Sequence, residues 1–158
     1  MSRAFFGRPE TAPVRGGAHV TLYLVPVFER QLVAFDVSAP QARGRWLPWT
    51  VLDFGQNPYE AAAGLADRWC GGRITDLALV DVMSFEVEGG GWELAIVFRA
   101  ELSRLPEPTE DQAPHVFAEG HFDAIGRFDP VDLERWVRQS RQPAAQQAAP
   151  PANGGMIF

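Results

Sequence analysis

Apolar and polar residues alternate along much of the chain in a way that predicts β-strands. Runs rich in β-branched and aromatic residues occur at residues 20–28, 32–37, 73–87, 92–102 and 121–128. The short polar stretch Glu29-Arg30-Gln31 predicts a β-hairpin between the first two runs, and the sequence Glu-Gly-Gly-Gly predicts another between the next two. Because Pro26 cannot donate a backbone hydrogen bond, we expect it at a sheet edge or in a bulge.

The clearest helix signals lie in the middle of the chain. Asn57 is an N-cap residue, Pro58 suits the first helical position, and Glu60 completes a capping box. Gly71 and Gly72 predict the end of this helix. The apolar residues between these signals share one broad helical face: Ala61, Ala62, Leu65, Ala66 and Trp69.

A second helix is predicted near the end of the chain, where Asp129 and Pro130 provide a start signal. Its apolar residues form one stripe: Leu133, Trp136 and Val137. Three arginines form another stripe: Arg135, Arg138 and Arg141. We interpret the arginines as a solvated face rather than a phosphate-binding track, because the chain as a whole is acidic.

The remaining segments divide the chain into one domain with two flexible ends. Residues 1–17 are rich in Pro, Gly and Arg and have no periodicity, so we expect a flexible arm. Residues 18–141 form the domain, in which residues 38–54 and 103–120 are expected to be connecting segments. Residues 142–158 carry no charge and are rich in Pro, Ala and Gln, which predicts a disordered tail.

Composition limits the classes of function. Of the 158 residues, 46% are hydrophobic and 22% are charged, as in a globular protein of one domain. The 14 basic residues are all arginine, and with 20 acidic residues the net charge of −6 argues against a nucleic-acid or anionic-membrane partner. The absence of lysine, with many Pro, Gly and Ala residues, indicates a GC-rich bacterial genome. A single cysteine, no signal sequence and no membrane-spanning apolar run predict a cytoplasmic protein.

The order of the elements and several short motifs resemble the Nudix hydrolase superfamily. The sequence WLP at 46–48 resembles the family's W-x-x-P-G-G, and GQNPYEAA at 55–62 is close to its G-E-S-P-E-E-A-A. AIVFRAEL and GRFDPVDLERW resemble the strand that follows the family's box and its closing W-x-x-x-E-E-L segment. The resemblance covers residues 18–138 and implies an α/β (α+β) fold in which a mixed β-sheet lies between α-helices.

The resemblance also identifies where a metal site would lie. In Nudix enzymes the glutamates of the box G-x5-E-x7-R-E-U-x-E-E-x-G-U, with U apolar, hold divalent cations against a pyrophosphate. On this chain the opening glycine falls on Thr50, and only the late glycine is retained, as Gly71. The first glutamate, the arginine and the three closing glutamates are replaced by Gln56, Gly64, Leu65, Arg68 and Trp69. We interpret this degenerate box as a packed helix in a retired active site, in preference to an anion pocket in which Arg68 replaces the cation.

Other candidate chemistry is scattered along the chain. His121 and Asp123 would share one face of the strand predicted there, as an acid–base pair or, more simply, a surface pair without a role. Cys70, at a helix end, is predicted to be a buried and inert thiol. Acids outside the box that could build a replacement metal site are Asp53, Asp76, Asp81, Glu86, Glu88, Glu93 and Glu119. Asp81 lies in a predicted central strand, where a salt bridge to an arginine is the better explanation.

The sequence therefore predicts a Nudix-fold protein that binds a protein or a ligand without catalysis, with neither catalytic residues nor a cofactor. One alternative is an atypical hydrolase of nucleoside diphosphate-X compounds that uses Mg²⁺ or Mn²⁺ and acids outside the box. Another is a structural subunit. The expected partner is another protein or a second copy of the chain, and a nucleotide-like ligand is a further candidate. The candidate interaction residues are Phe5, Phe6, Trp46, Trp49, Arg68, Met156, Ile157 and Phe158. The two ends could instead fold back over Trp46 or Trp49.

Overall fold

The computed structural model describes residues 18–87 and 91–139. Seven strands and two helices follow one another in the chain: β1 (Ala18–Phe28), β2 (Gln31–Val37), β3 (Gly44–Trp46), β4 (Trp49–Val51), α1 (Pro58–Cys70), β5 (Ile74–Val87), β6 (Gly91–Leu102), β7 (Gln112–Val116) and α2 (Pro130–Arg138). The predicted arm at 1–17, the turn at 88–90 and the predicted tail at 142–158 lie outside the described residues. The domain boundaries at 17 and 141 therefore stay predictions.

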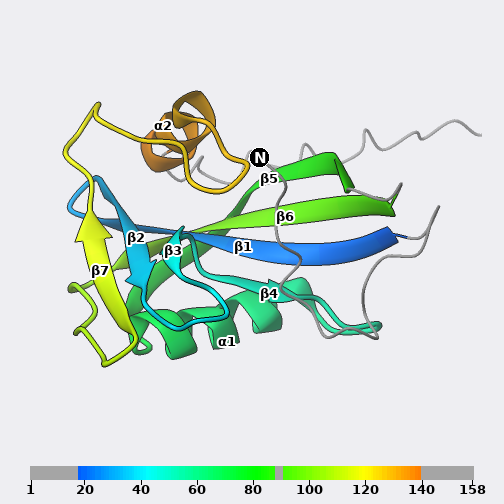
Figure 1. Cartoon of the computed structure of the whole chain (residues 1–158), viewed down its shortest axis with the longest axis horizontal. Helices are drawn as coiled ribbons and strands as arrows, with labels where there is room; N and C mark the ends of the chain where they lie inside the picture. The colour runs from blue at the N-terminus through cyan, green and yellow to red at the C-terminus, as the bar shows by residue number, and fades with distance from the viewer. Residues whose placement is uncertain (1–17, 88–90, 140–158) are drawn as a thin grey trace, which may run out of the picture.

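The strands form one mixed sheet that lies between the two helices (Figure 1). The main path of the sheet runs β3-β2-β1-β6-β5, with β4 paired to β1 and β7 paired to β2. At its centre β1 and β6 are parallel, from the pair Ala18 and Trp92 to the pair Val27 and Glu101. The other pairings are antiparallel. The predicted mixed sheet between helices is confirmed.

Both predicted strand pairs are confirmed. Glu29 and Arg30 connect β1 with β2 at φ values of 47° and 68°, the conformation of a tight two-residue hairpin turn. β5 and β6 pair along almost their whole length.

Pro26 lies in an internal strand, but at a position with a strand partner on one side only, which is locally the edge-like position expected. On the side away from β6, β1 pairs with β4 at residues 21–23 and with β2 at Val27 and Phe28. Pro26 itself pairs with Ala100 of β6. Leu24 lies two residues before Pro26 in the same strand. Its N–H points away from β6 and donates to the carbonyl of Pro48. Since N–H groups two residues apart point the same way, the N–H that Pro26 lacks is not needed for the β1–β6 ladder.

Three segments differ from the sequence-based expectations. The connecting segment at 38–54 contains β3 and β4, each of 3 residues, which is too short for a period of two to be recognised. The predicted loop at 103–120 contains β7, whose Pro114 is accommodated because β7 pairs only with β2. The strand expected at 121–128 is instead irregular backbone with a single bridge between Ile125 and Phe128.

The predicted starts of both helices and the predicted end of α1 are confirmed. The side chain of Asn57 accepts hydrogen bonds from the backbone N–H groups of Tyr59 and Glu60, and Gly71 ends α1 in the left-handed conformation with φ 68°. Asp129 caps α2 in the same way, through the N–H of Asp132. Local sequence signals therefore determine where each helix starts.

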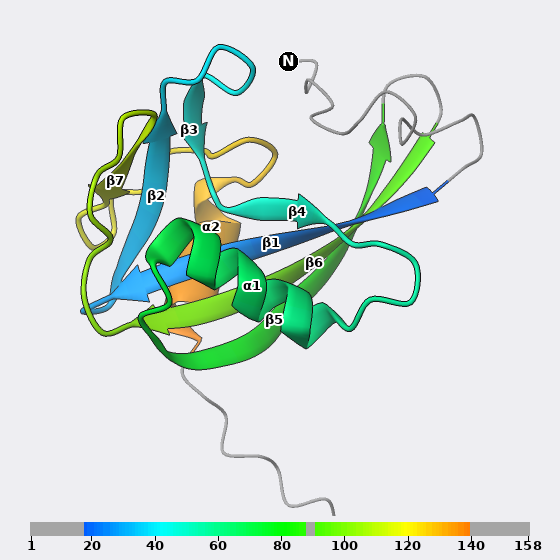
Figure 2. The same ribbon diagram turned by 90° about the horizontal axis from the view of Figure 1, so that it is seen from below.

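Each helix covers one face of the sheet. α1 lies along one face of the sheet (Figure 2). Of its predicted apolar residues, Ala61, Ala62, Leu65 and Ala66 join Leu22, Phe35 and Phe98 in one buried cluster, and Trp69 packs against it partly buried. On the opposite face, Leu133, Trp136 and Val137 of α2 are buried as predicted, with Val25 and other residues of β1 and β2. No helix in the described part of the chain is long and apolar enough to cross a membrane.

Asp81 joins α2 to the sheet, but not from a central strand. It lies at an irregularity in β5, the last strand on the sheet path. The predicted salt bridge is confirmed: Arg135 contacts Asp81 Oδ2 at 2.6 Å, and the indole N–H of Trp136 donates to the same oxygen at 2.9 Å. Burial raises the pKa of Asp81, but the hydrogen bonds from Trp136, Arg135 and the Val82 N–H outweigh it and leave the pKa below its ordinary value.

We predict that Asp81→Asn lowers the free energy of unfolding at pH 7 by about 1–3 kcal/mol, because it removes a charged acceptor from these bonds. The folded pKa lies below the unfolded one, so this stabilisation is complete above the unfolded pKa and is lost as pH falls through the folded pKa. The difference between wild type and Asp81→Asn should therefore shrink from pH 6 towards pH 2 in urea unfolding curves. Asp111→Asn, at an exposed carboxylate, should show no such difference at any pH.

Candidate functional site

The box positions on α1 are occupied by side chains that serve the core or face solvent. Leu65 is fully buried, and Trp69 is half-buried with its ring 5.3 Å from that of Phe35 in an edge-to-face contact. Arg68 is exposed, and its Nη1 atom lies 3.5 Å from where a Cβ of Gly64 would be. The guanidinium therefore lies back along the helix over Gly64, the residue at the position of the box arginine.

Gln56, at the position of the first box glutamate, is exposed and belongs to the loop before α1. Its side-chain oxygen accepts a hydrogen bond from the backbone N–H of Asp53 at 3.2 Å. The contact stabilises the turn that leads into the helix and does not gather oxygen ligands.

The scattered acids do not assemble into a replacement metal site. Within residues 18–87 and 91–139, no group of three or more His, Cys, Asp or Glu side chains is placed to hold a metal ion. Asp81 is engaged by Arg135, and Glu119 lies 3.7 Å from Arg30. Glu88 lies outside the described residues.

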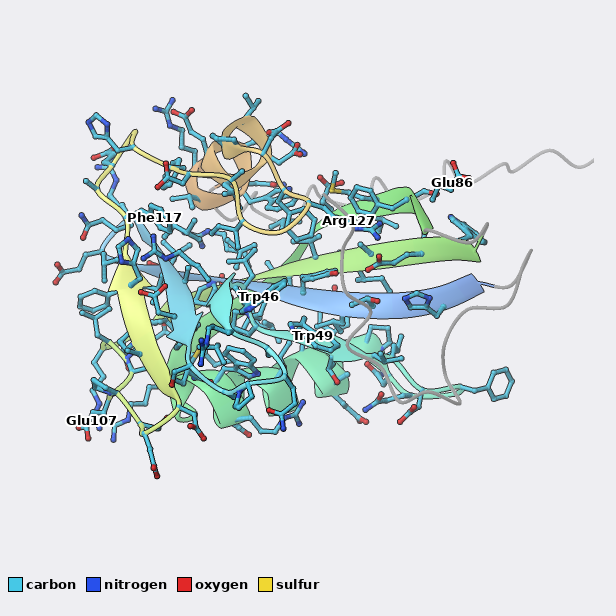
Figure 3. The ribbon with its side chains drawn as sticks, viewed as in Figure 1. Trp46, Trp49, Glu86, Glu107, Phe117 and Arg127 are labelled. Carbon is cyan, nitrogen blue, oxygen red and sulfur yellow. The ribbon has the colours of Figure 1, made fainter. Side chains whose placement is uncertain are left out.

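Glu93 is a buried carboxylate that the sequence analysis did not distinguish from the other acids. It is 2% exposed and accepts a hydrogen bond from the Tyr23 hydroxyl at 2.9 Å. Arg127, labelled in Figure 3, reaches its other oxygen at 3.2 Å. The same guanidinium lies over the ring of Phe85. This cluster attaches the segment before α2 to the sheet. From the sequence alone, it could have been found only by working out which residues of β1 and β6 share a face of the sheet.

A hollow at the C-terminal end of α1 gathers positive charge. It has a volume of about 270 Å³ and is lined by Arg68 and Trp69 of α1, by Arg73 just before β5, and by Arg104 and Glu107 of the loop after β6. Figure 3 shows Glu107 on this loop, at the same end of the molecule as β7. The hollow is thus adjacent to two of the degenerate box positions.

Sequence reasoning identified Arg68 but missed Arg73 and Arg104. The antiparallel pairing of β5 and β6 ends at Ile74 and Leu102, and the Ser103 N–H donates to the Arg73 carbonyl at 2.9 Å. Counting residues outwards from the predicted hairpin turn would have placed the two arginines near each other. That signal is weak, because irregularities in the pairing shift the register by two residues along the strands.

The other predicted chemistry has mixed outcomes. The predicted burial of Cys70 is confirmed, and burial raises the pKa of its thiol to about 12. Its inertness stays a prediction. His121 and Asp123 do not share a strand face, because both belong to the irregular segment before α2 and are exposed or nearly so. His115 does contact charged groups: its Nδ1 lies 3.1 Å from Arg45, which is itself paired with Asp36.

Arg135 and Arg138 are ion-paired rather than simply solvated, with Asp81 and Glu134 respectively.

Of the candidate interaction residues, Trp46 and Trp49 are half-buried within the domain (Figure 3). The indole N–H of Trp46 donates to the Ala42 carbonyl at 2.8 Å, and Trp49 packs against the core beneath α2. The remaining candidates other than Arg68 lie outside the described residues: Phe5, Phe6, Met156, Ile157 and Phe158.

Comparison with solved structures identifies the fold. The chain is similar to a MutT NUDIX hydrolase from Burkholderia pseudomallei, with a TM-score of 0.60 and 19% identity over 75% of this chain and 97% of the other. It is also similar to a C. elegans Ap4A hydrolase, with a TM-score of 0.56 and 13% identity over 74% and 93% of the two chains. A third similar structure is the Bacillus subtilis pyrophosphohydrolase BsRppH, with a TM-score of 0.53 and 14% identity over 84% and 86%.

No family model and no curated protein matches the sequence. At these identities the structural similarity establishes the architecture alone. The chain has the Nudix fold.

We predict that Leu65→Glu, which restores one box glutamate, lowers the free energy of unfolding by about 3 kcal/mol or more, because it buries a carboxylate in the core. Arg68→Glu, at an exposed position in the same helical turn, should cost less than about 1 kcal/mol. Urea unfolding followed by tryptophan fluorescence measures both. Equal losses for the two variants would contradict the assignment of Leu65 to the core.

Proposed function

We propose that this protein is a Nudix-fold binding module that does not cleave phosphoanhydrides. One observation carries the proposal: Leu65 lies at full burial in the core, where the box would place a metal-binding glutamate. Trp69, at another of those positions, packs on Phe35. Because metal-assisted cleavage depends on oxygen ligands that hold the cation against the diphosphate, a helix with this face lacks the required clamp.

The alternative, an atypical metal-dependent hydrolase, receives less support from the geometry. Asp81, Glu93 and Glu119 each face an arginine within 3.7 Å. To serve as cation ligands they would have to exchange these ion pairs for metal contacts. A structural subunit with no ligand remains compatible with the fold but leaves the positive hollow at the end of α1 without a role.

The binding partner is proposed as a ligand at that hollow, or as a second protein or second copy of the chain. Arg68 is the described candidate whose side chain is free to take part, since it is exposed and lines the hollow. We also propose that binding requires no Mg²⁺, Mn²⁺ or other cofactor, and that the protein is cytoplasmic.

We predict no metal-dependent turnover of nucleoside diphosphate-X compounds when the purified protein is assayed for released phosphate or nucleotide with Mg²⁺ or Mn²⁺. The reason is the missing cation clamp, so EDTA should leave the background rate unchanged. An active MutT-type hydrolase in parallel assays provides the positive control. EDTA-sensitive turnover well above background, abolished by Asp81→Asn or Glu119→Gln, would overturn the proposal and assign the catalytic acids.

A further inference from the structure

The arginines at the end of α1 differ from most others in this chain in having no acidic partner. Within the described residues, six arginines form ion pairs: Arg30, Arg45, Arg99, Arg127, Arg135 and Arg138. No ion pair or hydrogen bond in the described part of the chain involves the side chains of Arg68, Arg73 or Arg104. Three unpaired cations thus line one hollow of a protein whose net charge is −6.

A larger pocket on the α2 side shows the contrast. It has a volume of about 480 Å³ and is also lined by three arginines, Arg30, Arg99 and Arg138. Each of these has a carboxylate neighbour, at 3.7, 2.7 and 2.6 Å respectively. Its positive charge is therefore already neutralised by the chain, whereas that of the hollow at α1 is not.

The partial charge at the end of α1 explains the position of only one of the three arginines. The C-terminus of a helix carries a partial negative charge, which favours a cation in the last turn, and Arg68 occupies that place. Arg73 follows the helix after two glycines and precedes β5, and Arg104 follows β6 at the same end of the antiparallel β5–β6 pair. The three guanidinium groups together make the potential at the hollow positive, which favours an anion there.

The size and lining of the hollow indicate a small anion. A volume of about 270 Å³ is at the lower limit for organic ligands and suits a compact group. Guanidinium groups bind phosphate oxygens through paired, charge-assisted hydrogen bonds, and a dianion can satisfy more than one of them. The single acid in the lining, Glu107, leaves an excess of positive charge.

We propose that Arg68, Arg73 and Arg104 form a site for a phosphate group, as free phosphate or as the end of a small phosphate monoester, that binds directly and without a divalent cation. This inference rests on the proposed binding function and specifies its ligand. In this site arginines take the place of the divalent cation. Arg68 occupies a box position, Arg73 comes from the segment just before β5, and Arg104 comes from the loop just after β6.

The test measures binding of inorganic phosphate and of glycerol phosphate by calorimetry and thermal shift, in EDTA and at constant ionic strength. Acetate provides an arm with a carboxylate instead of a phosphate. The variants Arg68→Gln, Arg73→Gln and Arg104→Gln should each weaken phosphate binding about tenfold, since each loses a charge-assisted contact. The matched control is Arg43→Gln, an exposed arginine away from the hollow, which should bind phosphate as the wild type does.

Phosphate binding that is lost in the three pocket variants and retained in Arg43→Gln supports the site. Tighter binding of glycerol phosphate than of phosphate identifies a monoester as the ligand, and equal binding identifies the phosphate group alone. The inference is overturned if phosphate raises the melting temperature no more than acetate does, or if Arg43→Gln loses as much affinity as the pocket variants. Its failure leaves the proposed function intact, because only metal-dependent turnover overturns that function.

Discussion

The parallel pairing of β1 with β6 is the constraint on which the rest of this molecule depends. Two adjacent parallel strands cannot be joined by a tight turn, so the chain between them must cross over, and here it contains β2, β3, β4, α1 and β5. Both faces of the pair must be buried, and α1 and α2 each cover one of them. The hairpin partners β2 and β5 then extend the sheet on either side, which brings the ends of α1, β5 and β6 together.

The same pairing requires one face of α1 to pack against the sheet. Its buried residues pack on side chains of β1, β2 and β6, and Leu65 belongs to that contact surface. A carboxylate at this point would have to be hydrated or coordinated, and neither is available inside an apolar cluster. Of the positions that correspond to the box, Leu65 and Trp69 are therefore part of the packing between helix and sheet, whereas Gln56 and Arg68 are exposed.

The arginines of this chain are of two kinds: some form ion pairs that hold the fold together, and others have no acidic partner within the described residues. Asp81 with Arg135, and Glu93 with Arg127, attach α2 and the segment before it to the sheet, and their cations are neutralised within the fold. The arginines at the end of α1 make no such contact within the described residues. An acidic protein that keeps three unpaired cations in one hollow has the electrostatic arrangement of an anion site, whichever anion occupies it.

By itself the sequence determined the features that depend on neighbouring residues. Asn57, Asp129 and Gly71 mark helix ends through bonds that span only a few positions, and the alternation around Glu29 and Arg30 specifies a hairpin. The absence of the box glutamates can also be read directly from the sequence. Only the tertiary structure decided that Pro26 lies in an internal strand, that a proline-containing segment forms β7 beside β2, and that Arg73 and Arg104 meet Arg68. These outcomes depend on strand register and on pairing between distant segments, whose free energy comes from burial across the sheet and leaves no local pattern in the chain.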